Sequence, residues 1–416
     1  MDQQQDQQRR VIRVLVVAQV LGGVGAGATL SLGALLAAET SGSSAWSGMA
    51  ATMATLGAAA AAVPLASLAQ RRGRSVSLAT GALLAGCGAL LAITAASLAL
   101  FPLLLVALVL LGAGSATGLQ ARFAATDLAT DATRGRSLAV VVWSTTVGAV
   151  LGPNLFEPGE AVAGYLGIPP LSGGFVFSAA AQAAAAAVYL LGLRPDPLLT
   201  ALRHQAAARP AGSAPPQKRR GLTILARTPA ARFAVVSIAV SHGAMVAVMS
   251  MTPVHLHDHG AGLTVVGLTI SLHVAGMYAL SPVFGWIADR AGRTQGILAG
   301  EVLLLAALLI AWRGSESEAW VTVSLILLGL GWSAVIVSAS ALLAGAVDVG
   351  ERAPVQGSSD LVMNLAGALG GALAGPALVL LGYPGLGLVT AVPVAVVLLW
   401  TVTRLARARS RTPAPA

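Results

Sequence analysis

The sequence predicts an all-α integral membrane protein of twelve transmembrane helices, arranged as two bundles of six. Of the 416 residues, 56% are hydrophobic and 10% are charged, a balance that suits lipid rather than water as the solvent. Apolar runs of about 20 residues, the length that a helix needs to cross a hydrocarbon core, recur along the whole chain. Because backbone groups in lipid must bond within their own segment, these runs are expected to be helices.

The predicted spans follow one another with short polar interruptions. They cover residues 12–38, 47–69, 76–97, 100–121, 137–155, 171–193, 232–252, 263–287, 295–312, 319–346, 360–382 and 385–403. The first run is too long and too rich in glycine for the short apolar core of a cleavable signal peptide, so the N-terminus is expected to stay cytoplasmic. The single cysteine, Cys87, excludes internal disulfides and cysteine-cluster metal sites.

The basic residues are distributed as topology signals rather than as a patch for nucleic acid. With twelve spans, every Lys and Arg except Arg313 falls on the side of the two termini. The positive-inside rule then places both termini in the cytoplasm of a bacterial cell and the chain in the cytoplasmic membrane.

The longest polar interruption divides the chain into two halves. Residues 194–231 contain several prolines and the basic run Lys218-Arg219-Arg220, which is typical of a flexible cytoplasmic linker. The predicted organisation is an N-terminal six-helix bundle (1–193), this linker (194–231), and a C-terminal six-helix bundle with a basic tail (232–416).

Two pairs of matching segments indicate that the halves are parallel repeats. The loop after the eighth span, with Gly285, Asp289, Arg290, Gly292 and Arg293, aligns with the loop after the second, where Ala66 and Gln70 replace Gly285 and Asp289. Likewise Gly148-x-x-x-Gly152-Pro153 aligns with Gly371-x-x-x-Gly375-Pro376. The offsets of 219 and 223 residues agree within loop variation.

The pattern Gly-x-x-x-Asp-Arg-x-Gly-Arg resembles the loop signature of the major facilitator superfamily, and the resemblance spans the whole chain. It implies the major facilitator fold and transport by alternating access. It also implies that the loop of Gly285, Asp289, Arg290, Gly292 and Arg293 acts as a gate that joins helix ends in one state. Since Gln70 replaces the acid in the first half, that loop departs from the pattern.

Ionisable residues are scarce at mid-depth in the predicted spans. Spans one to six contain no Asp, Glu, Lys or His near their middle, and Glu301 in span nine lies toward its cytoplasmic end. A carboxylate proton relay in the first half and a buried arginine site for organic anions are therefore not expected.

Histidine and methionine instead gather in spans seven and eight. Five of the six histidines and four of the eight methionines lie between His242 and Met277. Met245 and Met249 share one helix face, as do His273 and Met277, and the opposite directions of the two spans bring both pairs to similar depth. Thioether and imidazole donors suit Cu(I), which neutral ligands can hold without burying a countercharge.

These paired motifs, with 28 residues from Met245 to His273, resemble the signature of the CcoA-type copper importers, a branch of the same superfamily. The resemblance implies that Met245, Met249, His273 and Met277 are the copper ligands. Members of that branch carry further cysteines, whereas this chain has only Cys87, so it lacks an internal thiol relay. The accessory candidates are His242, Met251 and a metal-collecting group in the predicted outer loop, His255, His257 and His259.

The resulting hypothesis is import of copper as Cu(I) by a protein that is not an enzyme and needs no cofactor. Its partners would be the copper ion, the lipid bilayer and a copper chaperone or oxidase-assembly recipient, with no nucleic acid. One alternative is efflux of a hydrophobic organic compound or drug by a major facilitator antiporter. Another is a membrane sensor or assembly factor that binds metal without moving it.

Overall fold

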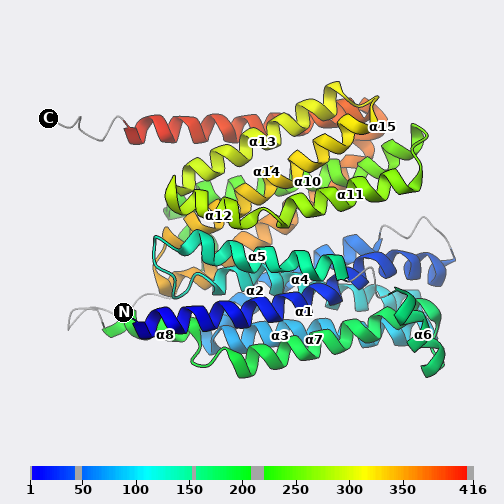
Figure 1. The fold of residues 1–416 in the computed structure, drawn as a ribbon, viewed down its shortest axis with the longest axis horizontal. Coiled ribbons are helices and arrows are strands. Elements are labelled where there is room, and N and C mark those ends of the chain that lie inside the picture. Colours follow the sequence, from blue (N-terminus) through cyan, green and yellow to red (C-terminus); the bar gives the residue numbers. More distant parts are fainter. Residues whose placement is uncertain (1, 43–48, 152–155, 208–219, 410–416) are drawn as a thin grey trace. The chain divides into compact units, whose positions relative to one another are not determined.

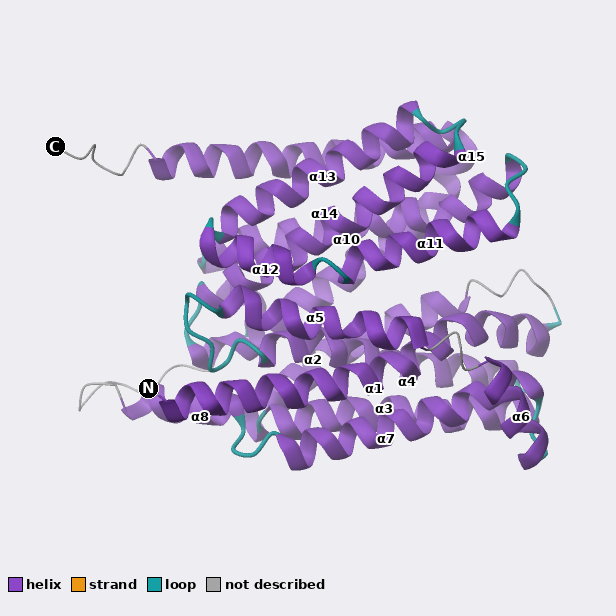
Figure 2. Ribbon diagram, viewed as in Figure 1, coloured by secondary structure: helices purple, strands orange, loops and turns teal. Residues whose placement is uncertain are grey.

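The computed structural model describes residues 2–42, 49–151, 156–207 and 220–409, and over these residues every regular element is a helix (Figure 2). The helices are labelled in Figure 1. Their bounds are α1 (Asp2–Ser41), α2 (Met49–Arg72), α3 (Arg74–Ser97), α4 (Phe101–Ala124), α5 (Arg134–Leu151), α6 (Phe156–Leu166), the 3₁₀ turn η3 (Pro170–Ser172), α7 (Gly173–Gly192), α8 (Pro197–Ala207), α9 (Gly221–Arg227), α10 (Pro229–Asp258), α11 (Leu263–Tyr278), α12 (Ser281–Arg290), α13 (Arg293–Arg313), α14 (Glu318–Gly345) and α15 (Val349–Arg409).

The all-helical prediction is confirmed, and each of the twelve predicted spans coincides with helix in the described residues. Two spans differ in detail. The span at 263–287 is divided between α11 and α12, and α15 contains two predicted spans separated by Gly382, whose φ of 68° breaks the helical conformation. The end of the predicted span 137–155 and the Gly152-Pro153 motif lie outside the described residues. Among those residues, nine helical stretches are long and apolar enough to cross a membrane, fewer than the twelve spans predicted.

The chain forms two compact units. Unit 1 comprises Met1–Thr130, Val140–Thr228 and Val347–Asn364, and unit 2 comprises Asp131–Ala139, Pro229–Ala346 and Leu365–Ala416. Each unit therefore includes a short segment from the other half of the sequence. The predicted boundaries at 193 and 231 stay predictions.

Small residues allow the helices of unit 1 to pack closely. A methyl group added at Gly57 of α2 would lie 1.9 Å from the Val109 carbonyl oxygen, and one at Gly112 of α4 would lie 2.1 Å from that of Ala54. Such backbone contact is the usual way in which apolar helices associate where water provides no driving force. It explains the dominance of alanine and glycine in these spans.

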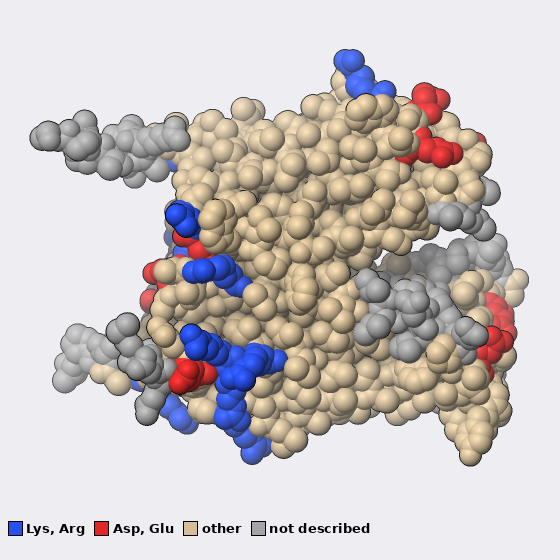
Figure 3. Space-filling view, viewed as in Figure 1, with Lys and Arg blue, Asp and Glu red and all other residues tan. Residues whose placement is uncertain are grey.

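Two parts of the predicted linker are helical. Helix α8 buries Leu198 against Ala69 and Ala353, all within unit 1, and α9 covers Gly221–Arg227. The proline-rich segment 208–219 lies outside the described residues. On each unit, the charged side chains visible in Figure 3 lie toward the helix ends, and the middle of the visible face is uncharged.

Candidate functional site

His273 on α11 is completely buried, and its environment determines its tautomer. Nδ1 lies 2.7 Å from the Leu325 carbonyl oxygen on α14. Because a carbonyl only accepts, Nδ1 carries the proton and Nε2 carries the lone pair. Nε2 has no hydrogen-bond partner among the described residues. A buried acceptor without a partner is costly, so Nε2 is a position from which a ligand could be bound.

Glycines fix the turn that carries His273 and Met277 against α14. A methyl group at Gly329 of α14 would lie 2.5 Å from the His273 carbonyl oxygen, and one at Gly276 would lie 2.9 Å from that of Ile326. Met277 is also buried, with 8% of its surface exposed. The His273-x-x-x-Met277 pair therefore lies in the interior of unit 2, on a helix held at backbone contact with α14.

The second pair lies on α10, where Met245 is buried at 2% exposure and Met249 is half-buried. Helices α10 and α11 each pack more extensively on α14 than on each other. The structure thus places both pairs on helices that share α14 as a neighbour. No hydrogen bond joins the pairs among the described residues, and convergence of the four donors on one ion stays a prediction.

His242 makes a contact with a neighbouring helix. Its Nδ1 accepts a 3.1 Å hydrogen bond from the indole N–H of Trp332 on α14, and the two rings are 6.1 Å apart. A methyl group at Gly367 of α15 would lie 2.7 Å from the His242 ring. These contacts fit a helix-joining role for His242. Met251 is half-buried farther along α10.

The histidines expected in an outer loop lie mostly on helix, which corrects that expectation. Helix α10 continues through Pro253 to Asp258 and includes His255. His255 is buried, donates from Nε2 to the Ser315 carbonyl oxygen at 2.8 Å, and stacks on Tyr383 at 4.1 Å. The His255 side chain is therefore buried against α15 and the Ser315 turn, on a segment that is helix rather than loop.

The collecting group receives little support from this arrangement. The exposed His259 ring lies 4.1 Å from that of His255, and its Nδ1 bonds the His255 carbonyl oxygen at 2.8 Å. The His257 side chain lies outside the described part of the chain. Within that part, no group of three or more His, Cys, Asp or Glu residues is placed to hold a metal.

Asp289 of the predicted gating loop caps the start of α5 within unit 2. Its carboxylate accepts hydrogen bonds from the backbone N–H groups of Gly135 (2.7 Å) and Arg136 (2.9 Å). A methyl group at Gly285 would lie 2.6 Å from the Ala139 side chain, so this glycine permits the approach. An acid at a helix N-terminus satisfies unpaired N–H groups and the helix dipole.

The arginines of the same loop bind nearby groups. Arg293 lies 3.1 Å from the Asp131 carboxylate, which also pairs with Arg134, and Arg290 lies over the Trp286 ring. The hydrogen bond from Arg293, followed by the charge of Arg134, lowers the pKa of Asp131. Gly292 has a φ of 113°, a conformation that favours glycine at this turn.

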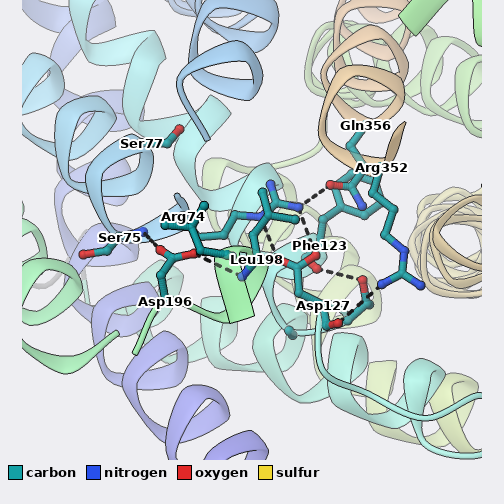
Figure 4. A network of polar contacts seen from close by, with 12 residues as sticks. Arg74, Ser75, Ser77, Phe123, Asp127, Asp196, Leu198, Arg352 and Gln356 are labelled. Atoms are coloured by element: carbon teal, nitrogen blue, oxygen red, sulfur yellow. Dashed lines mark hydrogen bonds and ion pairs between the residues drawn. The ribbon is translucent and has the colours of Figure 1, made fainter. Parts of the chain in front are cut away.

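The corresponding loop of the first half uses an amide instead of the acid. Gln70 donates from Nε2 to the Gly350 carbonyl oxygen at 2.7 Å, and Arg74 pairs with Asp127 at 2.8 Å (Figure 4). Arg74 is fully buried and also contacts Gln356. The departure from the signature at Gln70 is therefore accompanied by a hydrogen bond to α15 within unit 1.

A second buried ion pair in unit 1 was not anticipated from the sequence. Arg122 on α4 lies 2.7 Å from Asp360 on α15, with 2% and 0% of their side chains exposed. The only sequence signal was an acid at the start of an otherwise apolar span.

The family model described as Major Facilitator Superfamily matches residues 15–262 and 234–416. The chain is 38% identical over 378 residues to the uncharacterized MFS-type transporter YdeG of Bacillus subtilis, covering 90% of this chain and 87% of that one. It is 28% identical over 356 residues to the riboflavin transporter RfnT of Brucella anthropi, covering 85% of each. The structure is similar to that of the human organic anion transporter MFSD10, with a TM-score of 0.76, 17% identity, and coverage of 95% and 99%.

Proposed function

Since this chain belongs to the major facilitator superfamily and is a multi-pass membrane transporter rather than an enzyme, we propose that its substrate is copper, imported as Cu(I) by alternating access. The proposal depends above all on His273. Its Nε2 lone pair is buried and has no hydrogen-bond partner within the described ranges, while its Nδ1–H is held by the Leu325 carbonyl. Metal-binding imidazoles are commonly oriented by such a second hydrogen bond.

The neighbouring donors match a soft monovalent ion. Met277 lies one turn from His273, and Met245 is buried on α10. Thioethers favour Cu(I) over harder ions, and uncharged ligands add no fixed negative charge that would retain the ion. The four-donor site comprises Met245, Met249, His273 and Met277.

In the proposed cycle, copper enters from outside the bacterial cytoplasmic membrane and leaves to a stronger thiolate acceptor inside. The distribution of Lys and Arg favours cytoplasmic termini, so the acceptor would be a cytoplasmic chaperone or an oxidase-assembly recipient. Because Cys87 is the sole cysteine, transfer to thiolates would occur outside this chain.

Uptake of radiolabelled copper by cells with and without the gene tests the proposal. Met245→Leu, Met249→Leu, Met277→Leu and His273→Phe should each reduce uptake at least tenfold at limiting copper, because each removes a donor while keeping volume. The matched control is Met363→Leu, a fully buried methionine of unit 1, which should leave uptake unchanged. Unchanged uptake in all four donor variants would refute the site.

The second candidate is an uncharged organic substrate, favoured by the 28% identity to a riboflavin transporter. Within unit 1, Gln19 donates to Thr145 at 3.0 Å and Gln182 to the Gly22 carbonyl oxygen at 3.4 Å, so neutral amides supply polarity in this interior. Export of a hydrophobic compound would use the same kind of surface. Uptake of labelled riboflavin, or drug resistance that follows expression, with no effect of His273→Phe, would favour this candidate.

A further inference from the structure

Glu301 is a buried carboxyl group in unit 2 that the proposed substrate site does not use. It lies on α13, eight residues from the first residue of that helix, which is about 12 Å along the axis. Only 2% of its surface is exposed. A carboxylate this deep in a chain that crosses lipid needs either a cation or a proton to compensate its charge.

No cation compensates Glu301 among the described residues. It makes no ion pair there, and its hydrogen-bonding neighbours in that part of the chain are two hydroxyl groups that lie outside ideal hydrogen-bond geometry. The polar groups that face it are the hydroxyls of Ser237 on α10 and Thr401 on α15. Both are uncharged and buried.

The charged residues on the surrounding helices point to other contacts. Arg404, one turn beyond Thr401 on α15, places its guanidinium 4.5 Å over the Phe233 ring of α10. Arg232 on α10 is exposed. The acid of α14, Glu318, is in the first turn of that helix and exposed, while Arg293 at the start of α13 pairs with Asp131.

Since the described residues around Glu301 supply no compensating cation, its burial favours the neutral acid over the carboxylate. We propose that Glu301 is a proton-binding site: the folded protein takes up one proton there, held between α10, α13 and α15. Ser237 and Thr401 provide hydroxyl oxygens that can accept from the acid or donate to it after small rotations. Release of the proton requires water to reach the carboxyl group, which requires these helices to separate.

The position of α13 indicates where separation would occur. At the turn of Glu301, α13 is at backbone contact with α14, since a methyl group at Gly300 would lie 2.8 Å from the Gly331 carbonyl oxygen. The carboxyl group instead faces side chains of α10 and α15. Proton binding would therefore depend on whether α10 and α15 are packed against α13. It would not depend on which substrate the transporter carries.

The test measures the apparent unfolding temperature of the purified full-length protein from about pH 5 to about pH 9. A proton bound only in the folded state stabilises it at low pH, and this stabilisation is lost as the pH rises. The wild-type temperature should fall by roughly 2 °C or more across this range. Glu301→Gln and Glu301→Leu should abolish that fall, whereas the exposed matched control Glu318→Gln should retain it.

Infrared difference spectroscopy provides an independent readout that does not depend on substrate. The wild type should show the carbonyl stretch of a protonated carboxylic acid that titrates in this range, and the Glu301→Gln variant should lack it. A fall in unfolding temperature that persists unchanged in both Glu301 variants, or an acid band unaffected by Glu301→Gln, would overturn the proposal. Failure of copper uptake would leave both measurements interpretable, because neither uses copper.

Discussion

Replacing Asp360 by Asn removes the negative charge from an ion pair that unit 1 holds away from water. The Arg122 guanidinium lies 2.7 Å from the Asp360 carboxylate, and the two side chains are 2% and 0% exposed. Breaking a buried pair by removing one partner costs about 3–5 kcal/mol, because the remaining charge is left uncompensated. Arg122 also lies 4.8 Å from the Phe123 ring, a cation–π contact that is present with or without the Asp360 carboxylate and so leaves this difference unchanged.

The expected destabilisation by Asp360→Asn is therefore about 3–5 kcal/mol. It corresponds to a decrease of roughly 3–6 °C in apparent unfolding temperature for a chain of this size. A fluorescence-based thermal shift of the purified protein in detergent measures it. The matched control is Asp258→Asn at an exposed position, which should change the temperature by less than about 2 °C.

The double variant Arg122→Met, Asp360→Met distinguishes a charge effect from lost packing. Since replacing both charges by apolar groups is often neutral, it should recover most of the loss. If Asp360→Asn is as mild as the exposed control, or if the double variant is less stable than the single one, the buried pair does not have the role assigned to it.

Three further outcomes are expected. Asp289→Ala should lower the free energy of unfolding by about 1–2 kcal/mol, because the cap on α5 is lost, and a thermal shift measures this. Asp289→Asn should lower it less. An unchanged unfolding temperature for Asp289→Ala would contradict the capping role. Gly112→Leu should prevent stable expression because α2 and α4 are in contact at the Ala54 carbonyl oxygen, and normal membrane yield would disprove that requirement. The Arg293 contact holds the pKa of Asp131 below its usual value, so the pair stabilises the fold above about pH 3.8 and is lost as pH falls further. With Asp131 83% exposed, Asp131→Asn should cost under about 1 kcal/mol at pH 7 and progressively less as the pH falls below about 3.8, which a pH series of unfolding temperatures can check.

The helical spans were predictable because lipid allows few alternatives to a long apolar helix. The sequence could not, however, locate the ends of helices whose polar residues are buried by other segments. His255 was expected in a loop, but it lies on α10 and contacts the Ser315 carbonyl and the Tyr383 ring, 60 and 128 positions later, which local sequence cannot indicate.

The sequence predicts which residues could form the candidate site, but it does not predict which helices those residues pack against. The spacing of His273 and Met277 indicated a shared face, and burial of both agrees with that. Nothing in the sequence indicated that α14 would be the neighbour of both α10 and α11, or that Arg122 and Asp360, 238 residues apart, would pair. Such contacts depend on tertiary packing rather than on periodicity.

The atom that orients the imidazole of His273 belongs to the main chain at Leu325. Exchange of that leucine for any other amino acid leaves the oxygen in place, so ordinary point mutation there cannot reverse which ring nitrogen carries hydrogen. Substitution of the surrounding side chains would then alter the polarity around His273 while the electron pair on Nε2 persisted. The same ring nitrogen of His273 would therefore stay free of hydrogen through many substitutions around it.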